Sequence, residues 1–435
     1  MALAPDGSAS GPPLKDPETG ESGHIDAPGL QGFVFALFFI FGGITSLNDV
    51  IIPKLKELFD LSYFQAMLVQ SAFFAAYLII SIPGALLVKR IGYMRGAVVG
   101  LLAMLAGCLL FIPASQTAIY GLFLFALFVL ASGVTVIQVV ANPLISLLGP
   151  ARTAPSRLTF AQGFNALGTT LFPYFGSIII LGSLATVSAA ELSGPALDAY
   201  RAQESRAIVH AYIGLAVALA IVAAVVWRFR NHLKGEAHEA SSGLGGFDLL
   251  KRPRFGFGTG AIFLYVGAEV AIGSLIVSYL MQESVLGLAE QQAGKLIPFY
   301  WGGALIGRFI GSLILRFLSP GKVLSVVACG AITLLLLAAN MEGALAGYSL
   351  LAIGLMNAIM FPTIFSLASE GLGPRAADGS GVICMAIVGG AVIPPLTGGL
   401  ADAAGSLALA LTLPALCYVM IALFGLFALK PVKPL

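Results

Sequence analysis

Long apolar stretches dominate this chain and recur from Leu30 to Leu429. Each stretch is close to the roughly 20 residues that a helix needs to cross the hydrocarbon core of a bilayer. The stretches are continuously apolar and do not alternate, which favours helices over the strands of a lipid-facing barrel. The pattern predicts twelve transmembrane helices, at residues 30–56, 64–88, 96–113, 118–148, 158–181, 207–227, 256–281, 292–315, 323–340, 345–367, 379–400 and 407–429.

Composition agrees with a chain built for a bilayer. The 435 residues are 58% hydrophobic and only 10% charged, and the mean hydropathy is +0.95. A soluble core does not need this much apolar surface. We therefore expect an all-α integral membrane protein that is surrounded by lipid, and we expect no nucleic-acid partner.

Basic residues fall mainly on alternate connections between the predicted helices, and an excess of Lys and Arg marks cytoplasmic connections. The connections predicted to be cytoplasmic hold Lys89, Arg90, Arg95, Arg152, Arg157, Arg228, Arg230, Lys234, Lys251, Arg252, Arg254, Arg316, Lys322, Arg375, Lys430 and Lys433. The opposite connections carry fewer basic residues, chiefly Lys54, Lys56, Arg201, Arg206 and Lys295. This bias predicts that both termini are cytoplasmic.

Two polar segments divide the chain. Residues 1–28 are rich in Pro, Gly, Ser and acidic residues and lack the basic start and apolar core of a signal peptide, which predicts a disordered cytoplasmic tail. Residues 228–255 are polar and include several serines and glycines, which predicts a cytoplasmic linker. The remaining chain is interpreted as two six-helix bundles, at 29–227 and 256–429, and a short cytoplasmic tail at 430–435.

The two halves share local sequence patterns. Gly-Ala-Leu-Leu-Val-Lys at 84–89 has a counterpart, Gly-Ser-Leu-Ile-Leu-Arg at 311–316, and a basic residue follows each of them six positions later. Asn142-Pro143 and Phe361-Pro362 form a second matching pair. Two six-helix halves joined by a linker are the major-facilitator arrangement, in which the substrate site lies between the halves near the bilayer midplane. The alternative is a chance repeat in an apolar chain.

Amide side chains cluster in two neighbouring helices of the first half. Gln138 and Asn142 are four residues apart in the predicted fourth helix, and Gln162 and Asn165 are three apart in the fifth, so each pair shares a helix face. An amide both donates and accepts hydrogen bonds, which suits the hydroxyls of a sugar. The alternative is hydrogen bonding between helices, which is common in membranes. Four amides on adjacent helices favour a binding wall.

The second half supplies candidates for a facing wall. Tyr265 and Glu269 are four residues apart in the seventh helix, and Asn357, Phe361 and Phe365 follow one face of the tenth. Aromatic rings pack against the apolar faces of a pyranose while polar groups hold its edge, the usual mixture in a small-molecule site. The alternative for the two phenylalanines is plain packing.

Charged residues deep in the helices are rare here. Asp49, which follows Asn48 in the first helix, and Glu269 are the carboxylates placed well inside, and Arg308 is the deep cation. Intramembrane carboxylates usually mark an ion or substrate path. Asp49 and Glu269 are therefore candidates for coupling transport to a cation gradient. The alternatives are an interfacial position for Asp49, and for Arg308 an ion pair with Glu269 or with a helix end.

Several motifs in sequence order resemble one known family. They are Leu47-Asn-Asp-Val-Ile-Ile-Pro53, Gln70-Ser-Ala-Phe73, Gln138-Val-Val-Ala-Asn-Pro143, Ala161-Gln-Gly-Phe-Asn165, Tyr265-Val-Gly-Ala-Glu269, Phe361-Pro-Thr-Ile-Phe365 and Met385-Ala-Ile-Val-Gly-Gly390. Over nearly all of residues 32–429 the chain resembles the fucose–proton symporter family of the major facilitator superfamily, and especially its bacterial glucose/galactose branch.

The resemblance implies a hexose carrier of the bacterial inner membrane that works by alternating access. In the fucose symporter the aspartate matching Asp49 is the proposed coupling residue, assisted by a glutamate at the position of Gln138. The substitution leaves Asp49 as the better candidate for coupling. Gln138 and Glu269 match the glucose/galactose branch, which favours a gluco- or galacto-configured hexose over fucose. The family includes proton- and sodium-coupled members, and Asn48 or Thr45 could offer oxygens to either cation.

Other functions remain open at this point. The substrate could be another monosaccharide, such as fucose or N-acetylglucosamine, and the mode could be passive uniport or efflux antiport. Enzyme motifs are absent from the sequence: it contains neither a metalloprotease helix motif nor a phosphate-binding loop. The four cysteines are isolated in separate spans, without metal spacing. We expect a monomer that carries no resident cofactor, with a proton or sodium ion as the coupling ion.

Overall fold

The computed structural model describes residues 14–15, 22–24, 28–59, 63–117, 119–176, 194–231 and 245–430. Within these ranges, the side chains of residues 14–15, 22–24, 28–29, 47–59, 63–70, 151, 173–174, 176, 195–208, 245 and 290–291 lie outside the description. Most of the predicted tails and the middle of the predicted linker fall outside it as well. Within residues 1–28, β1 (Leu14–Lys15) and β2 (Ser22–His24) form a short antiparallel pair. The remaining elements are helical.

The first half contains six long helices. They are α1 (Pro28–Phe59), α2 (Tyr63–Ile91), α3 (Tyr93–Thr117), α4 (Tyr120–Leu147), α5 (Ala154–Gly176) and α6 (Pro195–Arg228), with a 3-10 turn, η1 (Ala151–Thr153), before α5. Gly92, with φ of 84°, joins α2 directly to α3, because this left-handed backbone is readily adopted only by glycine. Proline at the start of α6 supplies a backbone angle suited to the first helical turn.

The second half begins with the 3-10 helix η4 (Gly245–Lys251) and contains more broken helices. They are α7 (Pro253–Leu280), α8 (Glu290–Gly294), α9 (Ile297–Phe317), α10 (Pro320–Asn340), α11 (Gly343–Asn357), α12 (Met360–Ser369), η5 (Gly373–Arg375), α13 (Ala376–Met385), η6 (Ala386–Val388), α14 (Gly389–Ala404), α15 (Leu407–Ala410) and α16 (Thr412–Phe427). The predicted tenth and eleventh spans are therefore each built from shorter helices, which the hydrophobic pattern did not reveal.

The prediction of a twelve-helix membrane protein is confirmed. Ten segments of the described chain are long and apolar enough to cross a bilayer. Helices α1 and α5 complete the set of six in the first half. Large apolar side chains such as Leu102, Ile221 and Leu416 are about half exposed on the outside of α3, α6 and α16. A surface of this kind suits lipid contact.

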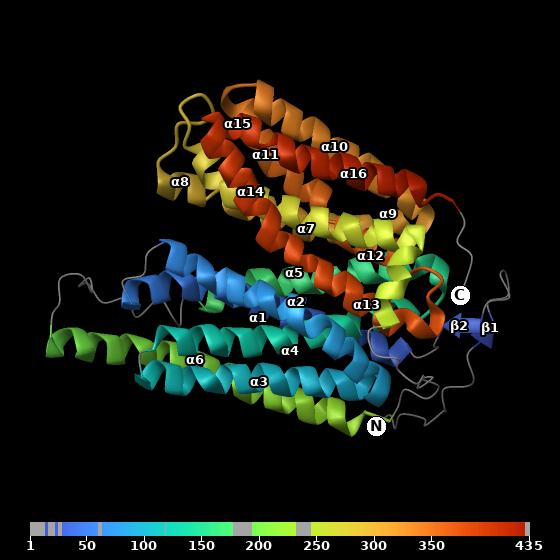
Figure 1. The fold of residues 1–435 in the computed structure, drawn as a ribbon, viewed down its shortest axis with the longest axis horizontal. Helices are drawn as coiled ribbons and strands as arrows, with labels where there is room; N and C mark the ends of the chain where they lie inside the picture. The colour runs from blue at the N-terminus through green and yellow to red at the C-terminus, as the bar shows by residue number, and fades with distance from the viewer. Residues whose placement is uncertain are drawn as a thin grey trace, which may run out of the picture.

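Packing repeats from one half to the other, and Figure 1 shows the halves as two layers of roughly parallel helices. In the first half α1 packs on α5, α3 packs on α4 and α6, and α2 packs on α4. In the second half α7 packs on α14, α10 packs on α11 and α16, and α9 packs on α11. Each contact of the first half thus has its counterpart six spans later. Between the halves, α2 packs on α13 and α5 packs on α9.

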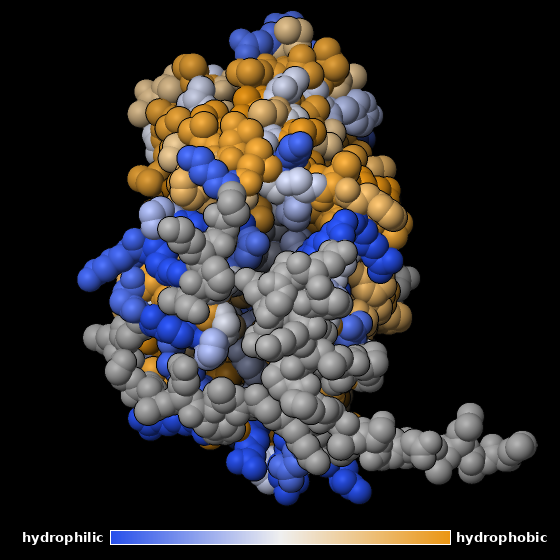
Figure 2. All heavy atoms as spheres, turned by 90° about the vertical axis from the view of Figure 1, so that its right-hand side faces the viewer, coloured by the Kyte–Doolittle hydropathy of each residue, from blue (hydrophilic) through white to orange (hydrophobic). Residues whose placement is uncertain are grey.

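Basic side chains gather at one end of the helices, which we call the basic end and define by Lys89, Arg157, Arg254 and Arg375. Hydrophilic residues are prominent at this end, and hydrophobic surface flanks them (Figure 2). Arg157 donates hydrogen bonds to main-chain oxygens at the end of α4, including that of Ser146 at 2.7 Å. Arg254 does the same for the end of α16, through Lys430 O at 2.8 Å. Arginine therefore ties neighbouring helix ends together.

An ion pair joins the two halves at the basic end. Lys89 Nζ of α2 lies 2.9 Å from Asp378 Oδ2 of α13, and these side chains are only 10% and 5% exposed. Close packing accompanies the ion pair, because a Cβ added to Gly381 would come within 2.6 Å of the Ala85 Cβ. Farther into the interface, the Ser156 hydroxyl donates to Ser312 O at 2.7 Å.

Arg375 extends this ion pair to η4. Its guanidinium binds both carboxylate oxygens of Asp248, at 2.7 and 2.6 Å, and also approaches Asp378 Oδ2 at 3.4 Å. These hydrogen bonds lower the pKa of Asp248. A lowered pKa means that the contact stabilises η4 above the ordinary carboxyl pKa of about 3.9 and is lost only as the pH falls below it. The contact is therefore formed throughout the neutral range.

We expect Lys89→Ala to loosen the contact between the halves, because it removes the closer cation of Asp378 and leaves the longer contact with Arg375. The cost should stay below the about 3–5 kcal/mol typical of a buried charge that loses its partner altogether. Cys384 of α13 is fully buried beside this interface and serves as the reporter. Alkylation of Cys384 by a maleimide, followed by mass spectrometry, should be faster in Lys89→Ala than in the wild type.

The conservative variant Lys89→Arg should keep the labelling rate near that of the wild type, because it retains a cation for Asp378. Glu370→Gln is the matched control, since it removes an ion pair with Arg254 that lies within the second half. Equal labelling rates in all these proteins would show that the Lys89–Asp378 ion pair does not hold the halves together.

Candidate functional site

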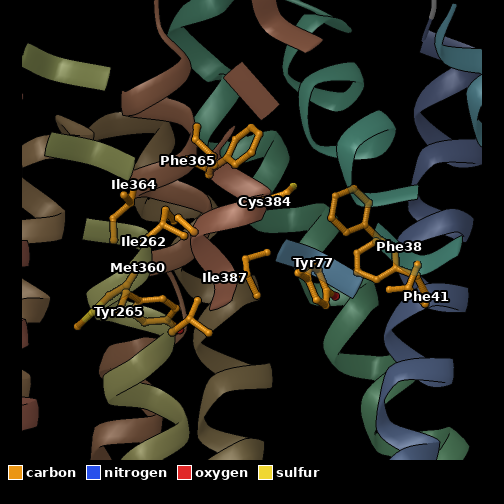
Figure 3. Packing of buried hydrophobic residues seen from close by; sticks show 14 of the residues in the cluster. Phe38, Phe41, Tyr77, Ile262, Tyr265, Met360, Ile364, Phe365, Cys384 and Ile387 are labelled. Atoms are coloured by element: carbon orange, nitrogen blue, oxygen red, sulfur yellow. The ribbon is translucent and has the colours of Figure 1, made fainter. Parts of the chain in front are cut away.

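Gln138 of α4 lies where the halves meet and is held by a tyrosine that the sequence did not single out. Its Nε2 donates a hydrogen bond of 2.6 Å to the hydroxyl of Tyr77 in α2. Tyr77 is 3% exposed, and it lies between Ile387 of η6 and the rings of Phe38 and Phe41 (Figure 3). The amide and the phenol therefore form one polar unit at the contact between the halves.

Asn142, one turn further along α4, is fully buried and has no hydrogen-bond partner for either amide atom among the described residues. In this state its side chain is closed off from solvent. A buried amide without partners is unfavourable by about 1–3 kcal/mol. Asn142 thus shares a helix face with Gln138, as predicted, but only Gln138 has a hydrogen-bond partner among the described residues.

The predicted amides of α5 face two different neighbours. Asn165 is partly exposed, and its Nδ2 donates a long hydrogen bond of 3.3 Å to Phe38 O of α1. Gln162 is 7% exposed, and its main-chain oxygen accepts a 3.1 Å hydrogen bond from Arg308 of α9, across the two halves. Within the described part of the chain, the Gln162 side chain makes no hydrogen bond.

Glu269, Tyr265 and Arg308 form the facing group of the second half. The carboxyl group of Glu269 lies against the Tyr265 hydroxyl and also faces the Arg308 guanidinium, although no direct ion pair joins the two charges in this state. Arg308 Nε is buried and has no partner among the described residues. This arrangement places a carboxyl group and a guanidinium with an unused donor beside Gln162.

Asn357 is surrounded by tyrosines. Its Oδ1 accepts from the Tyr418 hydroxyl at 2.7 Å, its Nδ2 donates to Tyr300 Oη at 2.9 Å, and its main-chain oxygen accepts from Tyr265 at 3.1 Å. Asn357 is 1% exposed. The predicted amide is therefore at the site but fully engaged with its own half.

Phe361, also predicted, begins the apolar part of this wall. Its ring is inclined by 27° to that of Phe365, with centroids 6.2 Å apart, and by 52° to that of Tyr265, with centroids 6.5 Å apart. Phe361 is partly exposed, whereas Phe365 is fully buried. Of the pair, Phe361 is thus the ring that a ligand could reach.

An aromatic cluster closes the space between α1, α5 and α9 next to Arg308. Phe35 is stacked on Phe164 at 5.1 Å, and Phe160 meets Phe309 edge to face at 5.7 Å. A Cβ added to Gly163 would come within 2.8 Å of the Phe309 ring. These rings therefore form a tightly packed apolar contact between the halves on the basic-end side of Gln162.

For two of the predicted site residues, the structure describes the backbone alone. The backbone of Asn48 and Asp49 belongs to α1, but their side chains lie outside the described residues. Thr45 is described, and its hydroxyl donates to Phe41 O of the same helix at 2.7 Å. Among the described residues, no group of three or more His, Cys, Asp or Glu side chains could hold a metal ion.

Three tyrosines were missed by the sequence reasoning: Tyr77, Tyr300 and Tyr418. The signal was available, because each places a hydroxyl inside a predicted apolar span, where it requires a partner. Glycine aids one of these contacts, since a Cβ added to Gly354 of α11 would clash with the Tyr300 backbone of α9. The contact between α9 and α11 therefore depends on a residue without a side chain.

Taken together, Gln162 of α5 lies beside a group of carboxyl, guanidinium and aromatic side chains from α7, α9 and α12. The other amides predicted in α4 and α5 are either fully buried or bonded within the first half. Such a site can donate to and accept from several hydroxyls and can pack an apolar ring face. This is the ordinary composition of a site for a small polar molecule.

Comparisons with known proteins agree with this architecture. The family model described as Major Facilitator Superfamily matches residues 34–387. The glucose/galactose transporter of Brucella abortus biovar 1 (strain 9-941) is 45% identical over 413 residues, which cover 94% of this chain and 97% of that protein. The L-fucose-proton symporter of Escherichia coli (strain K12) is 32% identical over 407 residues, covering 90% of this chain and 91% of that one.

A solved structure is similar along its whole length. It is a Major Facilitator Superfamily transporter, FucP, in the outward conformation, with a TM-score of 0.85 and 31% identity, and the match covers 92% of this chain and 99% of that one. The family match spans most of the twelve predicted helices, and these relatives are transporters and not enzymes. The chain therefore belongs to the Major Facilitator Superfamily and is a multi-pass membrane transporter.

Proposed function

We propose that this chain imports a hexose of the glucose/galactose type by cation symport through alternating access. The observation that carries the proposal is the meeting of Gln162, Glu269 and Arg308 across the two halves, with Phe361 beside them. The amide and the charged pair can hold hydroxyls, and the ring can pack against an apolar face of the sugar. The 45% identity with a glucose/galactose transporter supports this substrate class.

The two predicted carboxylates are proposed to have different tasks. Glu269 lies near Arg308 and Tyr265, and its carboxyl oxygens are suited to accept hydrogen bonds from sugar hydroxyls. Asp49 lies near the end of an apolar run, where a carboxylate usually serves an ion path. We therefore assign the coupling proton or sodium ion to Asp49, with Asn48 next to it as a neighbouring oxygen donor.

The side of the membrane to which the site opens follows from the orientation of the chain in the bilayer. If the basic end is cytoplasmic, as the distribution of Lys and Arg predicts, the contacts of α2 with α13 and of α5 with α9 close the cytoplasmic side. The site then communicates with the opposite side of the membrane. The likeness to FucP in its outward conformation supports this assignment.

The proposal is tested by uptake of labelled glucose, galactose, N-acetylglucosamine and fucose into proteoliposomes, with a proton or a sodium gradient imposed in turn. Glucose or galactose should accumulate above equilibrium under one of the two gradients. A membrane potential contributes about 2.3 kcal/mol per elementary charge for each 100 mV, so a potassium diffusion potential should increase accumulation further. Equilibration without accumulation would instead indicate uniport, and no uptake of any sugar would contradict the proposed substrate class.

Asp49→Asn should abolish accumulation but preserve sugar exchange between the two sides, because the amide retains the size of the side chain and loses the charge that binds the cation. Counterflow of labelled sugar measures exchange without a gradient. Glu269→Gln is the informative comparison, because it should weaken sugar binding and still allow accumulation at high sugar concentration. Accumulation by Asp49→Asn at the wild-type level would move the coupling site elsewhere.

Gln162→Ala should raise the KM for sugar about three- to tenfold, the effect of losing one or two ordinary hydrogen bonds. The maximal rate should change less, since the main-chain contact with Arg308 is retained. Thr170→Ala on the same helix is the control, because Thr170 is an exposed residue whose hydroxyl donates to Ala166 O of its own helix. An unchanged KM in Gln162→Ala would remove this amide from the site.

A further inference from the structure

The tenth span is interrupted where it passes the site. Helix α11 ends at Asn357, α12 begins at Met360, and the two residues between them form a turn. At this break, tyrosines from three other helices meet one amide: Tyr265 from α7, Tyr300 from α9 and Tyr418 from α16. Each of the three is at most 1% exposed. We call Asn357 and these three tyrosines the tyrosine–amide network.

Hydrogen bonding gives the network a fixed direction. The Tyr418 hydroxyl donates to Asn357 Oδ1, Asn357 Nδ2 donates to Tyr300 Oη, and Tyr300 Oη donates to the main-chain oxygen of Glu269 at 3.3 Å. If the Asn357 amide were flipped, its oxygen would face Tyr300, and the Tyr300 hydroxyl would have to donate to it. The same hydroxyl could then no longer donate to the main-chain oxygen of Glu269. One orientation of the amide therefore satisfies every group.

The buried tyrosines of the network hydrogen-bond to the backbone at two positions next to the site. Tyr300 holds the backbone of Glu269, and Tyr265 holds the main-chain oxygen that the helix break leaves free at Asn357. Phe361 is the second residue of α12, directly after this break. The rotation of α7, which aims the Glu269 carboxyl towards Arg308, and the start of α12, which presents Phe361, therefore both depend on the network.

We propose that Asn357 is a positioning residue and not a sugar ligand: together with Tyr300 and Tyr418 it fixes Glu269 and Phe361 in the geometry that binds the sugar. This inference rests on the proposed function. Both amide atoms of Asn357 already have partners, and with 1% exposure the side chain offers a ligand no surface. Its influence on binding passes through the groups that it holds.

Tyrosine-to-phenylalanine variants test the inference, because they remove one hydroxyl each from fully buried residues and retain the ring. Tyr418→Phe and Tyr300→Phe should each raise the KM for sugar about three- to tenfold, as expected for one lost hydrogen bond. Asn357→Ala combined with Tyr418→Phe should raise the KM no more than Asn357→Ala alone, because both changes break the same network.

Tyr279→Phe is the matched control. Tyr279 also lies on α7, is 2% exposed, and donates to a main-chain oxygen, that of Ala338 in α10, but it is not part of the network. Its KM should equal that of the wild type. If Asn357→Ala raises the KM while both network tyrosine variants leave it unchanged, Asn357 contacts the sugar itself and the proposal is wrong.

A second measurement works without any sugar and is therefore independent of the proposed function. Reaction of Glu269 with a hydrophobic carbodiimide, followed by mass spectrometry, reports how the carboxyl group is held. Labelling should be faster in Tyr300→Phe and Tyr418→Phe, because the carboxyl is no longer held towards Arg308, and unchanged in Tyr279→Phe.

The two possible failures are distinguishable. Wild-type protein that takes up none of the sugars contradicts the proposed function, while the carbodiimide rates still test the network. Equal labelling rates in the wild type and in both network tyrosine variants would overturn the positioning role even in a protein that transports sugar. Should Asn357→Ala not fold, the phenylalanine variants, which retain the ring, decide between the outcomes.

Discussion

A polar group inside a bilayer finds no water, so it must find a partner within the protein, and much of this structure follows from that constraint. The hydroxyls of Ser81, Thr135 and Thr397 satisfy it locally, each by donating to a main-chain oxygen four residues earlier in its helix. The amides cannot do so as simply, because each has donors and an acceptor to satisfy. Two of them, Gln138 and Asn357, are instead met by tyrosines from other helices, and these contacts hold the helices together.

The same device occurs in both halves. In the first half a tyrosine of the second span, Tyr77, bonds to an amide of the fourth, Gln138; in the second half a tyrosine of the eighth span, Tyr300, bonds to an amide of the tenth, Asn357. Gln138 and Asn357 stand four residues before the matching positions Asn142 and Phe361. The internal repeat is therefore visible in the hydrogen bonds of the site as well as in the packing of the helices.

The sequence predicted more of the fold than of the site. A membrane span is set by its own length and apolarity, so each one could be located without knowledge of its neighbours. The hydrogen-bond partners of the amides could not be located in this way, because Gln138 and Tyr77, like Asn357 and Tyr418, are 61 positions apart in the sequence. The pattern also missed the break after Asn357, since residues on both sides of it are equally apolar. Helical spacing correctly placed Gln138 with Asn142 on one face, but it could not show that one amide is paired and the other is not.

Asn142 shows how the interface between the halves differs from the interior of each half. Asn357 has a partner for every amide atom, whereas Asn142, on a helix that contacts α13 of the other half, has none among the described residues. An amide buried without partners costs about 1–3 kcal/mol, and this cost opposes the closing of the basic end. The Lys89–Asp378 ion pair and the packing of small residues act in the opposite direction. A carrier that alternates between two states needs such a balance, because an interface as fully satisfied as the tyrosine–amide network would hold one state too firmly to open.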